Sequence, residues 1–430
     1  MIFKTYRFDD LVEKYIDNRG KTPPLSEQGI PLLEVKHLPV EGKYPSLQTS
    51  KRVSEDVYKT WFRSHLEAGD ILFSTVGTTG RVGITPTNQK VAIAQNVLGL
   101  RFKSKLFDPS YAFYYLRAKP FQNEIESRLI TTVQASIKRG DMFEIPMKLP
   151  TVQIQKAISS ILSTLDDKIE NNCRMNETLE EMACTIFKSW FVDFDPVHAN
   201  AASKSPAFID TQTAALFPNS FGDDGLPNGW RFKKLRDIAE LNPTETIKKG
   251  KLTTYVEMAN LPTTGSCISN IELREFKSGT KFRNGDTLLA RITPCLENGK
   301  TAYVDILNDG EVAYGSTEYI VIRVKKPLPK FYSYILARNE HFREHAIRSM
   351  TGTSGRQRAQ ADMVASYEVV MPSKEVALAF SEKCQNLFSK IRCNASENKT
   401  LAELRETLLP KLLSGKIRLK DAEHEVEAAV

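Results

Sequence analysis

The sequence predicts a mixed α/β fold of the α+β kind, built as an internal repeat. Two similar domains are separated by two long antiparallel coiled-coil helices. Three observations predict this fold. A heptad pattern runs through residues 149–197, the same pattern returns in residues 372–419, and the regions before these two stretches share weaker landmarks. The order of domain, helix, domain and helix predicts a pseudo-two-fold relation between the halves.

The first long helix is predicted for residues 149–197. Residues at alternating spacings of four and three form one stripe along a helix. Thr151 is suited to cap its start, and Pro196 to stop it. Taken alone, the stripe is equally typical of a dimeric coiled coil or of one helix in a bundle. It consists of Ile158, Leu162, Leu165, Ile169, Asn172, Asn176, Leu179, Ala183 and Ile186.

The second long helix, residues 372–419, repeats the first at a constant offset, so that Leu165 recurs as Leu387. Two copies in one chain can pair with each other. Polar residues inside the stripe cost stability but fix register, and equal polar positions favour a single alignment. The polar residues predicted to set the register of the helix pair are Asn172, Asn176, Asn394 and Asn398.

Residues 1–148 are predicted to form the first domain. Short β-like runs occupy residues 70–74, 91–94 and 97–102, with turns between them. A helix follows, and Asp108 with Pro109 is a typical helix start. This mixture of strands and helices indicates a compact α/β domain.

Residues 227–371 are predicted to form a second domain that repeats the first with more drift. Asp70 corresponds to Asp286, and Tyr114 corresponds to Tyr334. Residues 198–226 are rich in Ala, Ser, Asn, Pro and Gly and are interpreted as a linker, and residues 420–430 as a tail. The helices are more alike than the domains, which indicates one shared docking role and two different targets.

Composition bounds the class of protein. A chain of 430 residues suits two to four domains, and 26% charged with 41% apolar residues is ordinary for globular proteins. Its formal net charge of +7 is compatible with a polyanionic partner. We expect a cytoplasmic protein, because the sequence has no apolar stretch typical of a membrane span or signal peptide, and its six cysteines form no C-x-x-C pair.

The length of the helices suggests a use. A helix of about 35 to 40 residues is roughly 50–60 Å long. An antiparallel pair of this length would hold the two domains at a fixed distance. Because B-DNA repeats every ~34–36 Å, domains at a fixed spacing can read two half-sites on one face of the duplex.

Several motifs resemble one protein family. The stretch from Leu165 to Val197, with LDDKIE, RMNETLE and FKSWFVDFDP, resembles the central helical region of specificity subunits of type I restriction–modification systems. Residues 408–419, LLPKLLSGKIRL, resemble their second helical region. Pro227-Asn228-Gly229-Trp230, followed by Lys233-Lys234-Leu235, resembles the entry to a target recognition domain, and residues 20–23 and 77–80 resemble first-domain landmarks. The first domain lacks a Pro-x-Gly-Trp entry of its own.

The resemblance covers essentially the whole chain and implies a function. Each of the two target recognition domains reads one half of a split DNA sequence. The helices bind two methyltransferase (modification) subunits, which hold S-adenosylmethionine and methylate adenine. Restriction subunits, which use ATP and Mg, join them to cleave unmodified DNA. The specificity subunit itself is expected to be non-catalytic, without a catalytic residue, cofactor or metal of its own.

DNA contact is predicted for two loops in each domain. Arg, Gln and Asn side chains can make bidentate contacts to base edges, whereas Lys, Ser and Thr favour phosphates. The alternative is that each is a polar loop exposed to solvent, without contact to DNA. The predicted residues of the first domain are Lys21, Thr75, Thr78, Thr79, Arg81, Gln134, Lys138 and Arg139. Those of the second domain are Arg291, Thr293, Asn298, Lys300, Ser354, Arg356, Gln357 and Arg358.

Two other functions compete with DNA reading. His341 and His345 fit the H-x-x-E-H zinc pattern, which suggests a stand-alone zinc hydrolase. A structural coiled-coil adaptor that binds no DNA is the other alternative. Nucleotide binding is excluded at Gly20-Lys21-Thr22 and Gly299-Lys300-Thr301, since both lack the first glycine of a P-loop. Trp190, Phe191 and Phe194 are expected on the outer face of the first helix, where a partner could bind.

Overall fold

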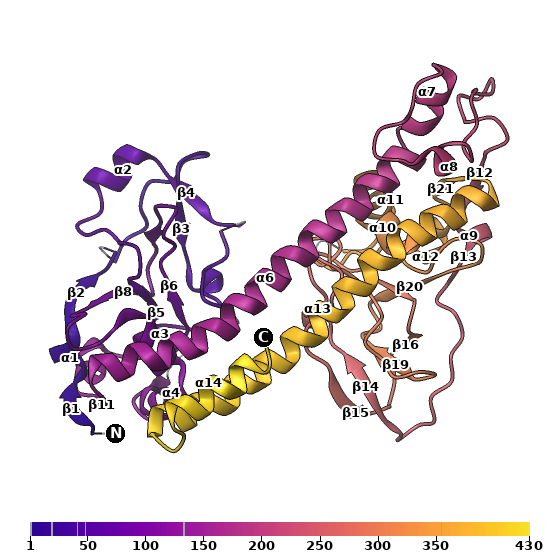
Figure 1. The fold of residues 1–430 in the computed structure, drawn as a ribbon. Helices are drawn as coiled ribbons and strands as arrows, with labels where there is room; N and C mark the ends of the chain where they lie inside the picture. The colour runs from indigo at the N-terminus through magenta and orange to yellow at the C-terminus, as the bar shows by residue number, and fades with distance from the viewer. Residues whose placement is uncertain (1, 19, 41, 48, 132–133, 354) are drawn as a thin grey trace. The chain divides into compact units, whose positions relative to one another are not determined.

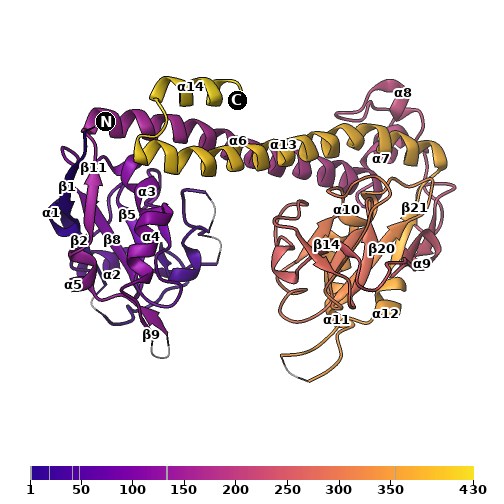
Figure 2. The same cartoon turned by 90° about the horizontal axis from the view of Figure 1, so that it is seen from below.

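The structure is a computed structural model that describes residues 2–18, 20–40, 42–47, 49–131, 134–353 and 355–430 (Figures 1 and 2). It divides into two compact units. The first comprises Met1–Asn171 and Glu397–Val430, and the second comprises Asn172–Ser396. Each unit holds one α/β domain, part of the long helix α6 (Val152–Phe191) and part of the long helix α13 (Lys374–Ser414).

The first domain is built on antiparallel sheet β2-β8-β5-β6 and on sheet β4-β3-β7, in which β3 and β7 are parallel. A ladder of β1 and β11 and a hairpin of β9 and β10 complete it. The strands are β1 (Lys4–Arg7), β2 (Val12–Ile16), β3 (Ile30–Leu33), β4 (Lys51–Val53), β5 (Ile71–Ser74), β6 (Val82–Ile84), β7 (Ala92–Ile93), β8 (Val97–Phe102), β9 (Ile130–Thr131), β10 (Ala135–Ser136) and β11 (Pro146–Leu149).

Helices of the first domain pack on the larger sheet and carry much of the core. The predicted helix start is confirmed, because Asp108 accepts a hydrogen bond from the Tyr111 N–H at 3.0 Å and Pro109 is the first helical residue. The buried cluster joins β5, β8 and α3 to residues of α6, α13 and α14. The helical segments are α1 (Phe8–Leu11), η1 (Val35–His37), α2 (Glu55–Thr60), α3 (Pro109–Arg117), α4 (Lys119–Glu126) and α5 (Arg139–Phe143).

The second domain repeats this topology. Its sheet β13-β20-β17-β18 corresponds to β2-β8-β5-β6, and its sheet β15-β14-β19-β16 again contains one parallel pair, β14 with β19. The strands are β12 (Arg231–Lys234), β13 (Ala239–Leu241), β14 (Leu252–Val256), β15 (Glu272–Glu275), β16 (Thr280–Arg283), β17 (Thr287–Ala290), β18 (Thr301–Tyr303), β19 (Val312–Gly315), β20 (Tyr319–Val324) and β21 (Glu368–Met371). The shorter helices of this unit are α7 (Asp195–Ala201), α8 (Thr211–Ala214), α9 (Leu235–Ile238), η2 (Met258–Asn260), α10 (Tyr332–Arg338), α11 (Glu340–Arg348) and α12 (Ala361–Ala365).

A buried aspartate at the start of the central strand has the same role in both domains. Asp70 accepts two hydrogen bonds from the Arg101 guanidinium at 2.9 and 2.8 Å. Asp286 accepts two from Arg323, both at 2.7 Å. These side-chain hydrogen bonds raise the pKa of both arginines. The Asp70–Asp286 correspondence predicted from sequence is therefore confirmed at the level of side-chain contacts.

In the first unit, α6 and α13 lie side by side and run antiparallel (Figures 1 and 2). Asp166 of α6 pairs with Arg405 of α13 at 2.6 Å, and two residues further along α6, Lys168 faces Glu397 at 3.4 Å. Because the residue numbers rise along α6 while those of their partners fall along α13, the two helices run antiparallel. Tyr114 of α3 also donates to Asp166, at 2.6 Å, and so attaches the first domain to α6.

In the second unit the same antiparallel pairing includes polar contacts of Asn176 and a contact between aromatic rings. Asn394 donates to the Asn176 side chain at 2.8 Å, and Asn176 donates to the Ile391 carbonyl at 3.4 Å. Asn172 of this unit is buried, and Asn398, which belongs to the first unit, is half-buried. Further along, the rings of Phe191 and Phe380 lie 4.9 Å apart. Asn176 and Asn394 are predicted polar positions of the two stripes, whereas Phe191 lies beyond Ile186, the last residue of the first stripe.

The first long helix ends earlier than predicted. It stops at Phe191, and Phe194 adopts a left-handed conformation with φ of 55°. Pro196 was expected to stop the helix, but it lies in the first turn of α7. A left-handed residue near a helix end redirects the chain, and proline is well suited to a new first turn.

The predicted outer aromatic surface is wrong. Trp190 and Phe191 are 1% and 4% exposed, in the core of the second unit. Residues 198–226, interpreted as a linker, contain α8 and return Phe217 to within 4.9 Å of the Trp190 ring. Residues 420–430, interpreted as a tail, lie largely in α14 (Leu419–Glu427). Apolar side chains of residues 198–226 are buried in the core of the second unit, and those of residues 420–430 in the core of the first unit.

None of the helices in the described residues is long and apolar enough to cross a membrane.

Replacing Asp166 with Asn should destabilise the first unit by about 3 kcal/mol, because the buried Arg405 would keep only the exposed Glu406 as an ionic partner. The side chains of Asp166 and Arg405 are 5% and 12% exposed. A pair on the surface of the same unit offers the control. Arg7 and Glu144 are 57% and 64% exposed, so Glu144→Gln should cost less than about 1 kcal/mol. Thermal unfolding of the full chain measures both, and equal shifts of Tm would contradict the assignment.

Candidate nucleic-acid interface

Two loops predicted to contact DNA are joined by backbone hydrogen bonds in the first domain. The loop after β5 meets the β9–β10 hairpin. The Gly77 N–H donates to the Ala135 carbonyl at 2.9 Å, and the Ile137 N–H donates to the Thr75 carbonyl at 3.1 Å. Gly77 has φ of 80°, a conformation that favours glycine. The sequence did not show that these loops, about 60 residues apart, form one surface.

The second domain joins the equivalent loops by the same pattern. The Thr293 N–H donates to the Gln357 carbonyl at 3.0 Å, and the Ala359 N–H donates to the Arg291 carbonyl at 2.7 Å. Isolated bridges pair Val76 with Ser136 in one domain and Ile292 with Arg358 in the other. The hydrogen bonds thus define equivalent positions.

A third equivalent position precedes the next strand of the sheet. The Thr75 N–H donates to the Asn96 carbonyl at 2.9 Å, and the Arg291 N–H donates to the Glu318 carbonyl at 3.0 Å. At these three equivalent positions the first domain has polar, uncharged residues and the second domain has charged ones. The first domain has Thr75, Asn96 and Ser136, and the second domain has Arg291, Glu318 and Arg358.

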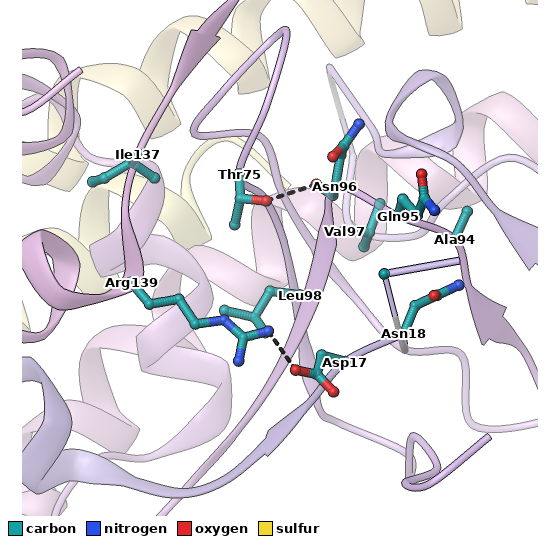
Figure 3. A pocket seen from close by; sticks show the side chains of 11 residues that line it. Asp17, Asn18, Thr75, Ala94, Gln95, Asn96, Val97, Leu98, Ile137 and Arg139 are labelled. Atoms are coloured by element: carbon teal, nitrogen blue, oxygen red, sulfur yellow. Dashed lines mark hydrogen bonds and ion pairs between the residues drawn. The ribbon is translucent and has the colours of Figure 1, made fainter. Parts of the chain in front are cut away.

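In the first domain the loops border an open pocket at the ends of β2 and β5 (Figure 3). Arg139 pairs with Asp17 across it at 2.5 Å, and the Thr75 hydroxyl donates to the Asn96 carbonyl at 3.2 Å. Asn18 and Gln95 also line it. The pocket therefore presents amide groups and a neutralised arginine.

The second domain has a pocket at the same place, but with more charge. It is lined by Arg291, Lys281, Glu245 and Tyr319, among others. The Nε of Arg291 is buried and has no hydrogen-bond partner among the described residues. Burial raises the pKa of Tyr319, so its hydroxyl stays protonated and donates to the Val256 carbonyl at 3.2 Å.

Arg358 is the most firmly held arginine of this surface. Its Nε lies 3.0 and 2.9 Å from the two carboxylate oxygens of Glu318, and its Nη2 lies 2.7 Å from Oε1. The hydrogen bonds to Glu318 raise the pKa of Arg358. The charge and the orientation of this guanidinium are therefore both fixed.

Within each unit, these loops lie at the end of the domain away from α6 and α13 (Figure 2). The β9–β10 hairpin extends from the first domain, and the loop between α11 and α12 extends from the second. The loops are thus placed away from the helices to which each domain is attached.

The side chains predicted to contact DNA differ from one another in exposure and in hydrogen bonding. Lys21, Thr78, Gln134, Lys138, Asn298 and Arg356 are exposed on the loops. Thr79 donates to the Ala135 carbonyl at 3.0 Å, Arg81 is half-buried, and Thr293 accepts from the Gln357 N–H at 3.0 Å. Ser354 lies outside the described residues. DNA contact by any of these residues stays a prediction.

Lys300 has a structural partner that the sequence did not reveal. Its ammonium donates to the carbonyls of Met258 at 2.7 Å and Ala259 at 3.3 Å. These contacts attach the start of β18 to η2. The acidic residues Asp17 and Glu318 were not predicted from the sequence either, since a carboxylate is not expected to face DNA. Their position next to strand ends was the available signal.

The H-x-x-E-H pattern is not arranged as a metal site. His341 is exposed, whereas a ring nitrogen of His345, Nε2, lies 2.8 Å from the Met363 carbonyl. A nitrogen that donates a proton to a carbonyl has no lone pair left for a metal. In the part of the chain that the structure describes, no three His, Cys, Asp or Glu side chains are grouped to hold an ion.

Comparison with known sequences identifies the repeat. The family described as the type I restriction modification DNA specificity domain matches residues 3–181 and again residues 227–405. The chain belongs to this family. Both matches contain one domain together with most of a long helix, so the family's unit is the repeat predicted from sequence.

Two specificity subunits match this chain over most of their own length. The chain is 25% identical to the type I restriction enzyme HindI specificity subunit of Haemophilus influenzae, over 82% of this chain and 87% of the relative. It is 24% identical to the MjaIX specificity subunit of Methanocaldococcus jannaschii, over 77% and 76%. The crystal structure of a type I S subunit from M. genitalium shares the fold, with a TM-score of 0.50, 17% identity and 96% of both chains covered.

Replacing Lys300 with Met should lower the stability of the second domain by about 1.5–3 kcal/mol, because two carbonyls lose a charged donor. The salt dependence of DNA binding should not change, since the ammonium is already engaged by two backbone carbonyls. Urea unfolding and a salt titration of DNA affinity measure the two effects. The control is Asn298→Ala on the same loop, which should leave stability within about 0.5 kcal/mol. A salt slope that falls by about 1 in Lys300→Met would instead make Lys300 a phosphate contact.

Proposed function

We propose that this chain is the DNA sequence-specificity subunit of a type I restriction–modification complex. Each target recognition domain reads one half of a bipartite site. The observation that carries this proposal is the shared loop scaffold with different side chains. The same backbone hydrogen bonds present Thr75 and Ser136 in one domain, but Arg291 and Arg358 in the other.

The chemistry of the loops suits double-stranded DNA. The exposed Lys21 and Lys138 of the first domain and Arg356 of the second carry positive charge toward a polyanion. Contacts to phosphates would orient each domain, while contacts to base edges would supply the sequence preference. A change of side chain at one equivalent position changes the base that is preferred without changing the fold.

The long helices are proposed to set the length of the unread spacer and to dock the partner subunits. α6 and α13 have 40 and 41 residues, which corresponds to roughly 60 Å each. Two modification subunits would bind them, and restriction subunits would join through these. S-adenosylmethionine, ATP and Mg would be held by the partners, in the cytoplasm, and this chain would catalyse nothing itself.

Deleting the gene should abolish adenine methylation at one split motif, because the partner methyltransferase would lose its sequence reader. Mapping of methylated adenines across the host genome, with and without the gene, measures this. Replacing residues 1–148 with the first domain of another family member should then alter one half of the motif and keep the other. A motif that stays intact after the exchange would contradict modular reading.

Removing one heptad from each long helix, residues 171–177 and 393–399, should shorten the spacer and leave both half-sites unchanged. The deletion preserves the stripe, because Leu179 then follows Ile169 at the position of Asn172. The same methylation map measures the outcome. If a complex that still methylates keeps the original spacer, the helices do not set the spacing.

A further inference from the structure

The pairing of Arg358 with Glu318 leaves a defined part of the guanidinium available. Glu318 engages the Nε side of the group through Nε and Nη2. The Nη1 group and the second Nη2 hydrogen, at the far end, are not used by this carboxylate. The Nη1 contact with the Arg356 carbonyl, at 3.5 Å, is at the limit of a hydrogen bond.

These remaining donors form a fork with a matching acceptor in DNA. In the major groove, guanine presents O6 and N7 side by side, and an arginine that contacts both is the commonest specific contact to a base. Arg358 is 43% exposed and Glu318 is 23% exposed. The pair is therefore open to a ligand on one side and fixed on the other.

A guanine explains this arrangement better than a phosphate does. Phosphate contact needs only positive charge, and a carboxylate beside the arginine would repel the phosphate and cancel part of that charge. A base contact needs direction, because two donors must meet two acceptors in one plane. The three hydrogen bonds to Glu318 fix the orientation of the Arg358 guanidinium, and the carboxylate lowers the net positive charge of the pair.

The scaffold also holds the pair in place. The Ile292–Arg358 bridge connects the residue to the loop after β17, and the Ala359 N–H donates to the Arg291 carbonyl. Glu318 lies next to the first residue of β20, and its carbonyl accepts from the Arg291 N–H. Both members of the pair are thus fixed by backbone as well as by each other.

The first domain has no such pair at the equivalent positions. Ser136 corresponds to Arg358, and Asn96 corresponds to Glu318. Neither residue can present a guanidinium. At these positions the arginine–carboxylate pair belongs to the second domain, whereas the pair of Arg139 with Asp17 in the first domain comes from other positions. The effect of Arg358 and Glu318 is therefore confined to one half of the site.

We infer that Arg358 reads a guanine in the half-site of the second domain, and that Glu318 is the positioning residue that orients it. This inference rests on the proposed function and names the base class that this surface takes. Loss of either residue has one shared consequence, which is relaxed preference at the same base pair.

The experiment uses the full chain assembled with its modification subunits. Initial rates of adenine methylation are measured on the wild-type motif and on a set in which each base pair of both half-sites is replaced in turn. Variants Arg358→Gln, Arg358→Lys, Glu318→Ala and the double variant Arg358→Gln/Glu318→Ala are compared. Thermal unfolding of each variant separates altered reading from an altered fold.

Arg358→Gln should reduce discrimination at one G·C pair by about 10- to 100-fold, with the other positions unchanged. Glu318→Ala should relax the same pair and raise binding to unrelated DNA, since a freed guanidinium can turn to phosphates. Arg358→Lys should behave like Arg358→Gln, because an ammonium cannot make the bidentate contact. The double variant should resemble Arg358→Gln alone, since the two residues act as one unit.

A matched control lies in the same domain. Arg348 of α11 pairs with Glu344 at 3.0 Å and is 80% exposed, and Arg348→Gln should leave the base preference unchanged. An equal loss of rate on all sequences in Arg358→Gln would make it a phosphate contact and overturn the inference, as would an unchanged profile in Arg358→Gln or Glu318→Ala. A wild-type complex without any split motif would instead overturn the proposed function, and this inference with it.

Discussion

Attachment of each domain to the helices depends on a buried tyrosine that donates to a carboxylate of α6. Tyr114 donates to Asp166 at 2.6 Å, and Tyr334 donates to Glu180 at 2.5 Å. Burial raises the pKa of both tyrosines, so each hydroxyl keeps its proton and remains a donor. The cation beside each pair has a different origin, because Arg405 belongs to α13 whereas Arg338 belongs to α10. The tyrosine–carboxylate hydrogen bond is thus common to both domains, but the arginine beside it comes from a different helix in each.

The loops of the two domains separate folding from recognition in a simple physical way. The hydrogen bonds that their junctions share are between backbone groups, which do not depend on side-chain identity. Thr75 and Arg291 occupy the same junction, although one is short and neutral and the other is long and charged. Substitutions at such positions can change the preferred base while the hydrogen bonds that hold the loops persist. This arrangement accounts for helices that resemble each other more than the domains do.

The structural features that could be predicted from the sequence are those supported by many residues at once, through periodicity or through repetition. The long helices follow from their heptads, and the likeness of the domains follows from repeated landmarks such as Asp70 and Asp286. Features that depend on a single distant contact were not predictable. The carbonyls that bind Lys300 and the carboxylate that orients Arg358 lie about 40 residues from them in the chain. The aromatic end of α6 was misplaced for the same reason, since the segment that covers Trp190 has little periodicity.

The composition of the first unit has a consequence for synthesis on the ribosome. The second unit is one continuous segment, residues 172–396, and can fold as soon as it has been made. The first unit needs residues 397–430, because Leu401, Leu408 and Val426 belong to its core. The part of the protein that is translated first is therefore completed last. Until then, the apolar face of its segment of α6 remains uncovered. Premature termination between residues 397 and 425 would remove core residues of the unit that contains the amino-terminal domain, and none of the second unit.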